Sequence, residues 1–476
     1  MFLTILTYEL KLLARSKWLL MLFSIVLLFV AFASFNGAKN TEKRLADIAV
    51  VKQEFLDKDQ AMVATLQKIE AGEKLAIPYW KLPSEPMTIG NRYPRLAIMQ
   101  PEALSFIATG QSDMYTHFKS PRIYGNTFAL DYAEMINPVQ LLFGNFDLAF
   151  VIIYILPLLI IAFTYNILSK EKELGTLRLL SSQPISVFRW LLQKVGIRFV
   201  IFNTLTSLII WIAIAIGSIK DAPNATSLFG LFLLIIGYQL FWFVLSFVIG
   251  IKINNSSKNA LTLIGCWLLL VLVIPATINQ LGNTLYPTPS RLNMINEIRL
   301  IKKENEKKQD EIMDSYLRNH PELAQGDGQE QFGFWHNYFA SEKVLEEKTK
   351  PLLARYNSQL KKQQTLQRTF QFLSPALLMQ QSLNKVAASS EMHYNDFKTQ
   401  VNEFSLTWRN YLVPMLFNQE KFTLKNYREL PEFNYRNRVA HPIWQDVLVL
   451  LLINGIVLLV FGDRSLWKQN SKTFLE

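Results

Sequence analysis

One charged connection in this chain has the spacing of a docking element. It lies between two apolar blocks and reads Ser169-Lys-Glu-Lys-Glu-Leu-Gly-Thr-Leu-Arg-Leu-Leu-Ser-Ser-Gln-Pro-Ile-Ser186. Gly175 predicts the end of a charged helix. A short second helix would then present Leu177 and Leu180 before Pro184 ends it. Such an apolar surface close to a bilayer is suited to a groove of another protein, although a helix that rests on lipid has the same pattern.

The residue patterns of known reaction centres are missing. The sequence has no G-x-x-x-x-G-K-[ST] loop for phosphates, no H-E-x-x-H and no G-x-S-x-G. Cys266 is the single cysteine, which excludes an internal disulfide, and the acid pair Glu346-Glu347 is typical of a solvated surface rather than of catalysis. We therefore predict no catalytic, metal or cofactor site in this chain. The five histidines are scattered without metal-ligand spacing: His117, His320, His336, His393 and His441.

The elements that position the connection are predicted membrane spans. Of the 476 residues, 50% are hydrophobic and only 18% are charged, and the apolar residues are gathered into blocks. About 20 apolar residues are needed to cross a hydrocarbon core of roughly 30 Å. The sequence therefore predicts an all-α polytopic membrane protein with six transmembrane helices, at residues 18–35, 148–168, 199–219, 228–251, 260–281 and 447–461.

Basic residues in the short connections predict the orientation of the spans. Lys and Arg accumulate in short loops on the cytoplasmic side of membrane proteins. Lys11, Arg15, Arg178 and Arg464 lie on the side of both termini, whereas the short loop on the other side has only Lys220. We therefore expect both termini in the cytoplasm. Much of the formal net charge of +11 belongs to this signal, and without a basic face interleaved with aromatic residues we predict no nucleic-acid binding.

The predicted spans hold no Asp, Glu, Lys, Arg or His between their ends. Proton-driven and ion-driven carriers need such groups at membrane depth. A transport function would therefore draw its energy from a partner on the cytoplasmic side. Bonding between helices explains the remaining polar residues better than a lined path does. They are Asn203, Thr204, Thr206, Ser207, Tyr238, Gln239, Ser246 and Asn454.

Two large inserts project from the spans on the extracytoplasmic side. The first is predicted to continue the first span as a long helix up to Gly72, after which its prolines predict loops and short strands. The second is mainly helical, with predicted helices at 291–317, 334–372, beyond 374, and 394–416. The sequence thus predicts five parts. Residues 1–35 hold an amphipathic helix and the first span, and residues 36–146 form the first insert. Residues 147–281 hold four spans and the cytoplasmic connection 169–198, residues 282–446 form the second insert, and residues 447–476 hold the last span and a cytoplasmic tail.

The connection resembles a known family motif. Residues 171–186 are similar to the E-x-E-x-G-T-L-x-x-L-x-x-x-P-x-S stretch of ABC transporter permeases of the ABC-2 exporter class. The amphipathic helix at 2–16 and the six spans also resemble this class. The large inserts resemble those of a subfamily in which Leu373-Ser-Pro-Ala-Leu-Leu-Met-Gln-Gln-Ser-Leu-Asn384 is followed by Phe397-Lys-Thr-Gln-Val401.

The resemblance implies a permease subunit of an ATP-driven exporter in the inner (cytoplasmic) membrane. A separate cytoplasmic ABC ATPase would bind ATP and Mg²⁺, and a second permease copy or homologue would complete the pair within the lipid bilayer. The alternative, which the long inserts favour, is a non-transporting scaffold that transmits force from the ATPase to envelope proteins. By resemblance the connection is a coupling helix, with the ATPase-coupling residues Glu171, Glu173, Gly175, Thr176, Leu177, Leu180 and Pro184.

Overall fold

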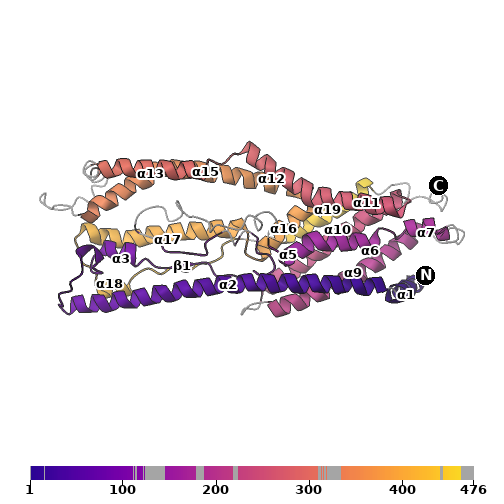
Figure 1. Ribbon diagram of the computed structural model, residues 1–476, viewed down its shortest axis with the longest axis horizontal. Coiled ribbons are helices and arrows are strands. Elements are labelled where there is room, and N and C mark those ends of the chain that lie inside the picture. Colours follow the sequence, from indigo (N-terminus) through magenta and orange to yellow (C-terminus); the bar gives the residue numbers. More distant parts are fainter. Residues whose placement is uncertain are drawn as a thin grey trace.

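Helices make up nearly all of the secondary structure in the described part of the chain (Figure 1). One antiparallel pair of short strands, β1 (Ala97–Ile98) and β2 (Phe118–Lys119), is the only sheet there, with Ala97 opposite Lys119. The all-α polytopic fold predicted from the sequence is confirmed. The computed structural model describes residues 2–15, 17–110, 112, 115–121, 123, 145–177, 187–217, 223–308, 312, 315, 318, 334–439 and 443–461.

Six helices among the described residues are long and apolar enough to cross a membrane, as the sequence predicts. The first belongs to α2 (Lys17–Glu70), which follows α1 (Phe2–Arg15). The third span lies in α9 (Val187–Gly217), which starts earlier than the predicted residue 199. This helix therefore also contains Lys194 and Arg198. The six spans are Leu19–Glu70, Leu148–Glu173, Phe188–Gly217, Ala225–Lys252, Ser256–Leu285 and Ile443–Val460.

Two of the spans contain a π-helical segment with a proline shortly after it. Pro157 and Pro275 lack the N–H group that would bond to the preceding turn, so carbonyl groups in that turn are left free. The second span consists of α5 (Leu148–Phe150), the π segment Val151–Ile155 and α6 (Leu156–Thr164). The fifth consists of α11 (Ser256–Trp267), the π segment Leu268–Val273 and α12 (Ile274–Leu285).

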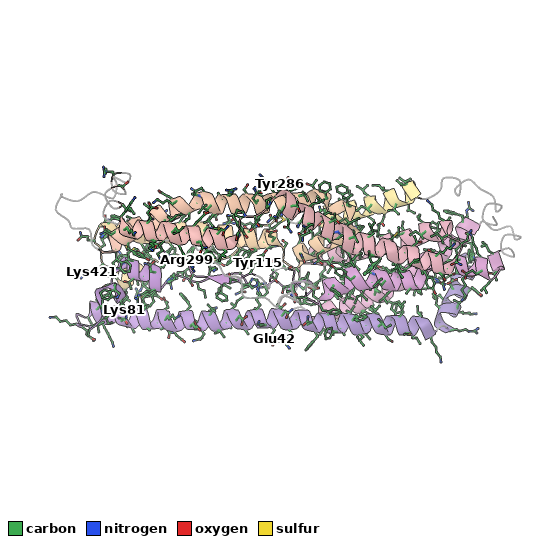
Figure 2. All side chains as sticks on the ribbon, turned by 45° about the horizontal axis from the view of Figure 1, so that its top comes forward. Glu42, Lys81, Tyr115, Tyr286, Arg299 and Lys421 are labelled. Atoms are coloured by element: carbon green, nitrogen blue, oxygen red, sulfur yellow. The ribbon has the colours of Figure 1, made fainter. Side chains whose placement is uncertain are left out.

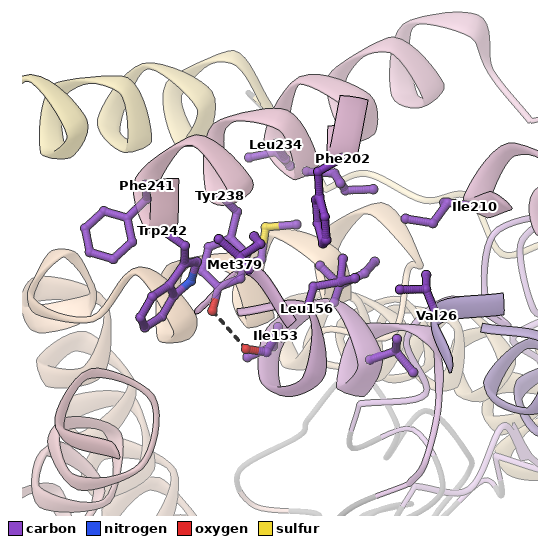
Figure 3. Packing of buried hydrophobic residues seen from close by; sticks show 14 of the residues in the cluster. Val26, Ile153, Leu156, Phe202, Ile210, Leu234, Tyr238, Phe241, Trp242 and Met379 are labelled. Carbon is purple, nitrogen blue, oxygen red and sulfur yellow. Dashed lines mark hydrogen bonds between the residues drawn. The ribbon is translucent and has the colours of Figure 1, made fainter. Parts of the chain in front are cut away.

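Side-chain hydroxyl groups bond to a carbonyl in each π segment. Tyr238 on α10 (Ala225–Lys252) donates from Oη to Ile153 O at 2.9 Å, as Figure 3 shows. Ser374 donates from Oγ to Leu270 O at 2.6 Å. Because lipid offers no hydrogen-bond donors, these bonds remove the cost of unpaired carbonyl groups inside a membrane.

α10 lies in the centre of the helical bundle. Its side chains Tyr238, Phe241 and Trp242 belong to one core with Phe202 and Met379, and each of the five is at most 2% exposed (Figure 3). Met379 belongs to α16 (Pro375–Val386), a short helix from the segment between the fifth and sixth spans. This helix therefore contributes to the core of the helical bundle, although it lies outside the predicted spans.

α10 also approaches α19 (Ile443–Phe461) closely. A Cβ atom at Gly230 would lie 2.4 Å from Ile443 Cγ2, and one at Gly237 would lie 2.9 Å from Leu450 Cδ2. Glycine at these two positions lets the helix backbones come together, as is common in membrane bundles.

Five of the eight polar residues predicted to bond between helices do so: Thr206, Tyr238, Gln239, Ser246 and Asn454. Gln239 Nε2 on α10 donates to Thr206 Oγ1 on α9 at 3.0 Å. Thr164 and Ser246 share a hydrogen bond of 2.8 Å between α6 and α10. These bonds hold side chains that would otherwise face an apolar interior without a partner.

The remaining helices extend away from the bundle beside the far half of α2 (Figure 1). We call this part of the molecule the projecting region. Charged side chains such as Glu42, Arg299 and Lys421 are exposed there (Figure 2). Its helices are α3 (Pro86–Arg92), α13 (Arg291–Lys307), α15 (Phe334–Phe370), α17 (Glu391–Phe417) and α18 (Leu424–Arg428), with 3₁₀ turns at Tyr79–Lys81 and Gln371–Leu373.

α2 runs without a break through 54 residues and links the bundle to the projecting region. At 1.5 Å per residue its length is about 80 Å. It ends shortly before Gly72, whose φ of +84° lies in the region that favours glycine, so the predicted end of this long helix is confirmed. In the second insert, α13 ends at Lys307, and most of its predicted remainder up to residue 317 lies outside the described part.

A second apolar core holds the projecting region together. It joins α2, α3, α15 and α17 through Met62, Met87, Phe339 and Trp408, which are each at most 1% exposed. Trp408 also donates from Nε1 to the backbone of α3, at 3.4 Å from Gly90 O. The projecting region is therefore packed as a unit around α17 and the end of α2.

Candidate functional site

The predicted docking connection begins with α7 (Ser169–Glu173). Gly175 follows with a φ of +72°, in the left-handed region that favours glycine, so the helix ends where the sequence predicts. The described part continues to Leu177, and both Leu180 and Pro184 lie outside it.

Glu171 on α7 belongs to a buried group of charges that joins three helices. Lys194 Nζ on α9 lies 2.8 Å from Glu171 Oε1 and 3.4 Å from Glu9 Oε1 on α1. Arg198 Nε on α9 lies 3.4 Å from the second oxygen, Glu9 Oε2. We call these four residues the charge cluster, in which Lys194 bridges α7 and α1.

The charge cluster is largely removed from solvent. Glu9 is 1% exposed, Lys194 5% and Arg198 9%. Arg198 also donates from Nη1 to Phe163 O at 3.0 Å, and its guanidinium group lies over the Phe163 ring. Breaking such a buried pair costs about 3–5 kcal/mol, whereas the intact pair adds little net stability. We infer that the cluster defines how α1, α7 and α9 are arranged more than it stabilises the fold.

Glu173 connects α7 to the start of α11. One carboxylate oxygen accepts a hydrogen bond from Ser256 N at 2.7 Å, and the other accepts one from Ser256 Oγ at 2.9 Å. Asn255 caps the same helix by accepting from Lys258 N at 3.1 Å. A carboxylate at this position satisfies a free N–H group and complements the helix dipole. A displacement of α7 would therefore also move the fifth span.

Thr176 ties the chain after Gly175 back to α7. Its hydroxyl group donates to Glu171 O at 3.1 Å and also to the Glu171 carboxylate. Both predicted acids, Glu171 and Glu173, thus have hydrogen-bond partners within the protein, on α9 and α11 respectively.

The apolar residues of the connection differ from the prediction. Leu177 was expected to face a partner, but it is 3% exposed and packs in the core of the bundle. Leu174 is instead 66% exposed. It is the C-cap residue of α7, directly before Gly175, where the chain turns. Helical periodicity in the sequence singles out Leu177, and only the place of Leu174 beside the glycine could have indicated its exposure.

α1 lies against α9 and is amphipathic, as predicted. Glu9 and Leu13 are buried, whereas Tyr8 is 66% and Leu12 41% exposed. α1 therefore presents an apolar face outward while its opposite face is held by the charge cluster.

The arrangement is suited to transmit movement. Residues 173–176 are exposed on one side, and the charge cluster and Ser256 lie behind them. Within the ranges that the structure describes, no three His, Cys, Asp or Glu side chains are grouped so that they could hold a metal ion. A partner that pressed on α7 would move α1 and α9 through Lys194, and α11 through Ser256.

Two family models match parts of the chain. Residues 291–436, which include α13 to α18, match a domain of unknown function, DUF3526. No curated protein matches the chain. Residues 103–276, which include α7 and the helices from α5 to α11, match the family described as ABC-2 membrane transporter related. Together with the six candidate spans, this match supports a permease-type membrane subunit of the ABC-2 class.

Proposed function

We propose that the chain is the membrane-spanning subunit of an ATP-driven ABC exporter, powered by a separate cytoplasmic ABC ATPase that binds ATP and Mg²⁺. The main support is the charge cluster behind the exposed residues 173–176, in a region that matches the ABC-2 membrane transporter related family. A second permease chain, identical or homologous, and a second ATPase complete the complex. The complex lies in the inner membrane, with both termini of the chain in the cytoplasm.

In this proposal the ATPase acts on α7 and α1. Closure of the ATPase pair displaces α7, and the bonds of Lys194 and Glu173 pass the displacement to α1, α9 and α11. The spans then exchange between two packed arrangements, because packed helices are bistable rather than continuously deformable. The substrate is moved outward, or extracted from the bilayer, during this exchange.

The proposed coupling residues differ in two respects from those expected from the sequence. Glu171, Glu173, Gly175 and Thr176 keep that role, as do Leu180 and Pro184 beyond the described part. Leu174 joins them as the exposed apolar contact for the ATPase. Leu177 anchors the connection in the bundle instead of facing the ATPase.

Co-purification of the ATPase with the full chain tests this proposal. Leu174→Asp places a charge where an apolar contact is expected, and since Leu174 is 66% exposed the core of the protein is not altered. Loss of such a contact costs at least about 1.4 kcal/mol, which is a tenfold change in affinity. We expect at least about tenfold less ABC ATPase, quantified by mass spectrometry, with the tagged variant than with the tagged wild-type chain.

The matched control is Leu300→Asp on α13. Leu300 is 68% exposed, almost the same as Leu174, but it lies in the projecting region. It should leave the recovery of the ATPase unchanged. If Leu174→Asp also leaves it unchanged, this connection is not the docking element. If the wild-type chain recovers no ABC ATPase at all, the proposed function is wrong.

One observation favours a second candidate, a non-transporting scaffold that transmits force to envelope proteins. α2 is continuous from the bundle to the end of the projecting region, where Glu70 Oε1 accepts a hydrogen bond from Leu424 N at 2.7 Å. Nearby, Asp59 pairs with Arg95 at 3.2 Å. A clamped helix of about 80 Å is suited to carry force over that distance. In reconstituted vesicles, ATP hydrolysis without movement of any lipid or solute would favour the scaffold over the exporter.

A further inference from the structure

A short segment of the first insert is buried in the helical bundle. It follows β1, runs from Leu104 to Gly110, and forms turns but no helix or strand. We call it the closing segment. Leu104, Phe106, Ile107 and Ala108 are each at most 3% exposed, and they belong to the same core as the side chains of α10. A part of the first insert, which the sequence predicts outside the spans, therefore packs among them.

Phe106 fills a space between the first and third spans. A Cβ atom at Gly37 on α2 would lie 2.1 Å from Phe106 O. One at Gly217, the last residue of α9, would lie 2.8 Å from Phe106 Cε2. Such distances leave no room for a methyl group on either helix unless Phe106 moves. Phe106 is therefore in close contact with both helices, at the end of the bundle next to the projecting region.

The closing segment is hydrogen-bonded to the start of the second span. Ala149 N donates to Ile107 O at 2.9 Å. Thr109 N donates to Asp147 Oδ2 at 2.8 Å, and the other oxygen of Asp147 accepts from Phe150 N at 2.9 Å. The bond to Phe150 remains when the closing segment moves away. Its departure therefore does not leave the carboxylate without a donor, which would cost more free energy.

Two further contacts join the closing segment to α2 and to the end of α16. Ser105 Oγ lies 3.4 Å from Thr41 Oγ1, within hydrogen-bond distance. Gly110 has a φ of +56°, and a Cβ atom there would lie 3.1 Å from both Asn384 Oδ1 and Ser389 Oγ. The closing segment therefore contacts α2, α5, α9 and the end of α16. Because it has no helix or strand of its own, its position depends on how these elements are arranged.

α9 connects the closing segment to the charge cluster. It is one continuous helix, with Lys194 and Arg198 near its start and Gly217 at its end. At 1.5 Å per residue, Lys194 and Gly217 are about 35 Å apart along the helix. A helix that moves as a rigid body passes a displacement at one end on to the other. A movement that reaches α9 through Lys194 would therefore change the contact between Gly217 and Phe106.

We propose that the closing segment is the outer gate of this membrane subunit. It closes the bundle between the ends of the first, second and third spans while the ATPase is at rest. When α9 moves, Phe106 leaves its place between Gly37 and Gly217, and the substrate passes out through the space that opens. This inference rests on the proposed exporter function and adds the element that closes its outward side.

The rate at which a single cysteine reacts with a membrane-impermeant maleimide measures the opening of the gate. Ser105→Cys places that cysteine in the closing segment at a site that is 9% exposed, and Cys266→Ala removes the native one. In nanodiscs, the full chain alone should react slowly. Adding Phe106→Ala deletes the buried ring, so the reaction should become at least about tenfold faster. In the complex with the ATPase, ATP and orthovanadate should give a similar rise without the substitution of Phe106.

The matched control is Ser341→Cys, also combined with Cys266→Ala. Ser341 is 8% exposed and lies on α15 in the projecting region, and a cysteine there should react slowly in every condition. An equal rise in reactivity for Ser341→Cys and Ser105→Cys would indicate a general loosening of the fold and would overturn the gate. An unchanged rate for Ser105→Cys after Phe106→Ala would overturn it as well.

The complex with the ATPase separates this proposal from the proposed function. If the complex hydrolyses ATP while the reactivity of Ser105→Cys is unchanged, the gate is wrong and the exporter proposal stands. If no ABC ATPase binds the chain, the proposed function is wrong and the gate falls with it.

Discussion

Replacing Lys194 with methionine removes the centre of the charge cluster and keeps most of the side-chain volume. Lys194 Nζ lies 2.8 Å from Glu171 Oε1 and 3.4 Å from Glu9 Oε1. After the replacement, Glu9 still has Arg198 as its partner. Glu171 retains only the hydroxyl group of Thr176. One carboxylate of the cluster, that of Glu171, therefore loses its directly bonded cation.

The magnitude follows from the burial of the two acids. Removing one partner of a fully buried pair costs about 3–5 kcal/mol. The Glu171 side chain is 28% exposed, so water replaces part of the lost interaction, and we expect about 2–3 kcal/mol. An unfolding entropy of roughly 2.1 cal/mol/K per residue corresponds to about 1 kcal/mol/K for 476 residues. The Tm of Lys194→Met should therefore be about 2–3 °C below that of the wild type.

Thermal unfolding of the full chain in detergent micelles, followed by tryptophan fluorescence, measures this shift. The matched control is Lys194→Met combined with Glu171→Gln, which removes the stranded charge as well as the cation. We expect the double variant to recover most of the lost stability, because the two residues interact directly. An unchanged Tm for Lys194→Met, or a double variant no more stable than the single one, would refute the reasoning about the buried pair.

Three further outcomes are expected from the same unfolding assay. Burial lowers the pKa of His117 from 6.5 to about 3, so its contribution to stability is complete above pH 6.5 and is lost as the pH falls toward 3. Between pH 7 and pH 5 the free energy of unfolding of the wild type should fall by about 2 kcal/mol more than that of His117→Gln. Equal losses would contradict the lowered pKa of His117. Gly37→Ala should lower the yield and the Tm, because its Cβ would lie 2.1 Å from the backbone oxygen of Phe106. The control Gly455→Ala, whose Cβ would have no atom within 4 Å, should leave both unchanged. Ser374→Ala removes the hydroxyl donor to a π-segment carbonyl and should cost about 1–3 kcal/mol, and a Tm within error of the wild type would show that the carbonyl finds another donor.

Several parts of the fold were predictable because local rules decide them. The number of spans follows from the length of the apolar runs, which must match the thickness of a bilayer. The ends of α7 and of the long α2 follow from Gly175 and Gly72, which both adopt a positive φ. The helical character of the second insert was likewise visible in its periodicity, and α15 and α17 lie close to the predicted positions.

The candidate site was predictable only in part. The sequence identified the connection and its acids, but Glu9 and Arg198 were not recognised as part of it. These two residues are far apart in the chain, and in sequence analysis the basic residues of this region serve as an orientation signal. The exposure of Leu174 and the burial of Leu177 also depend on which side of α7 meets the bundle, and that is decided by tertiary packing.

The sequence by itself determined that this is a six-span helical protein with a charged connection between its second and third spans, because apolar length and glycine stops act locally. Tertiary structure alone decided that Lys194 bridges α1 and α7, and that Ser374 reaches a carbonyl of the fifth span. The physical reason is that a buried polar group must find its partner in space. Which residue supplies that partner depends on how helices distant in the sequence pack together. Periodicity along the chain does not predict that packing.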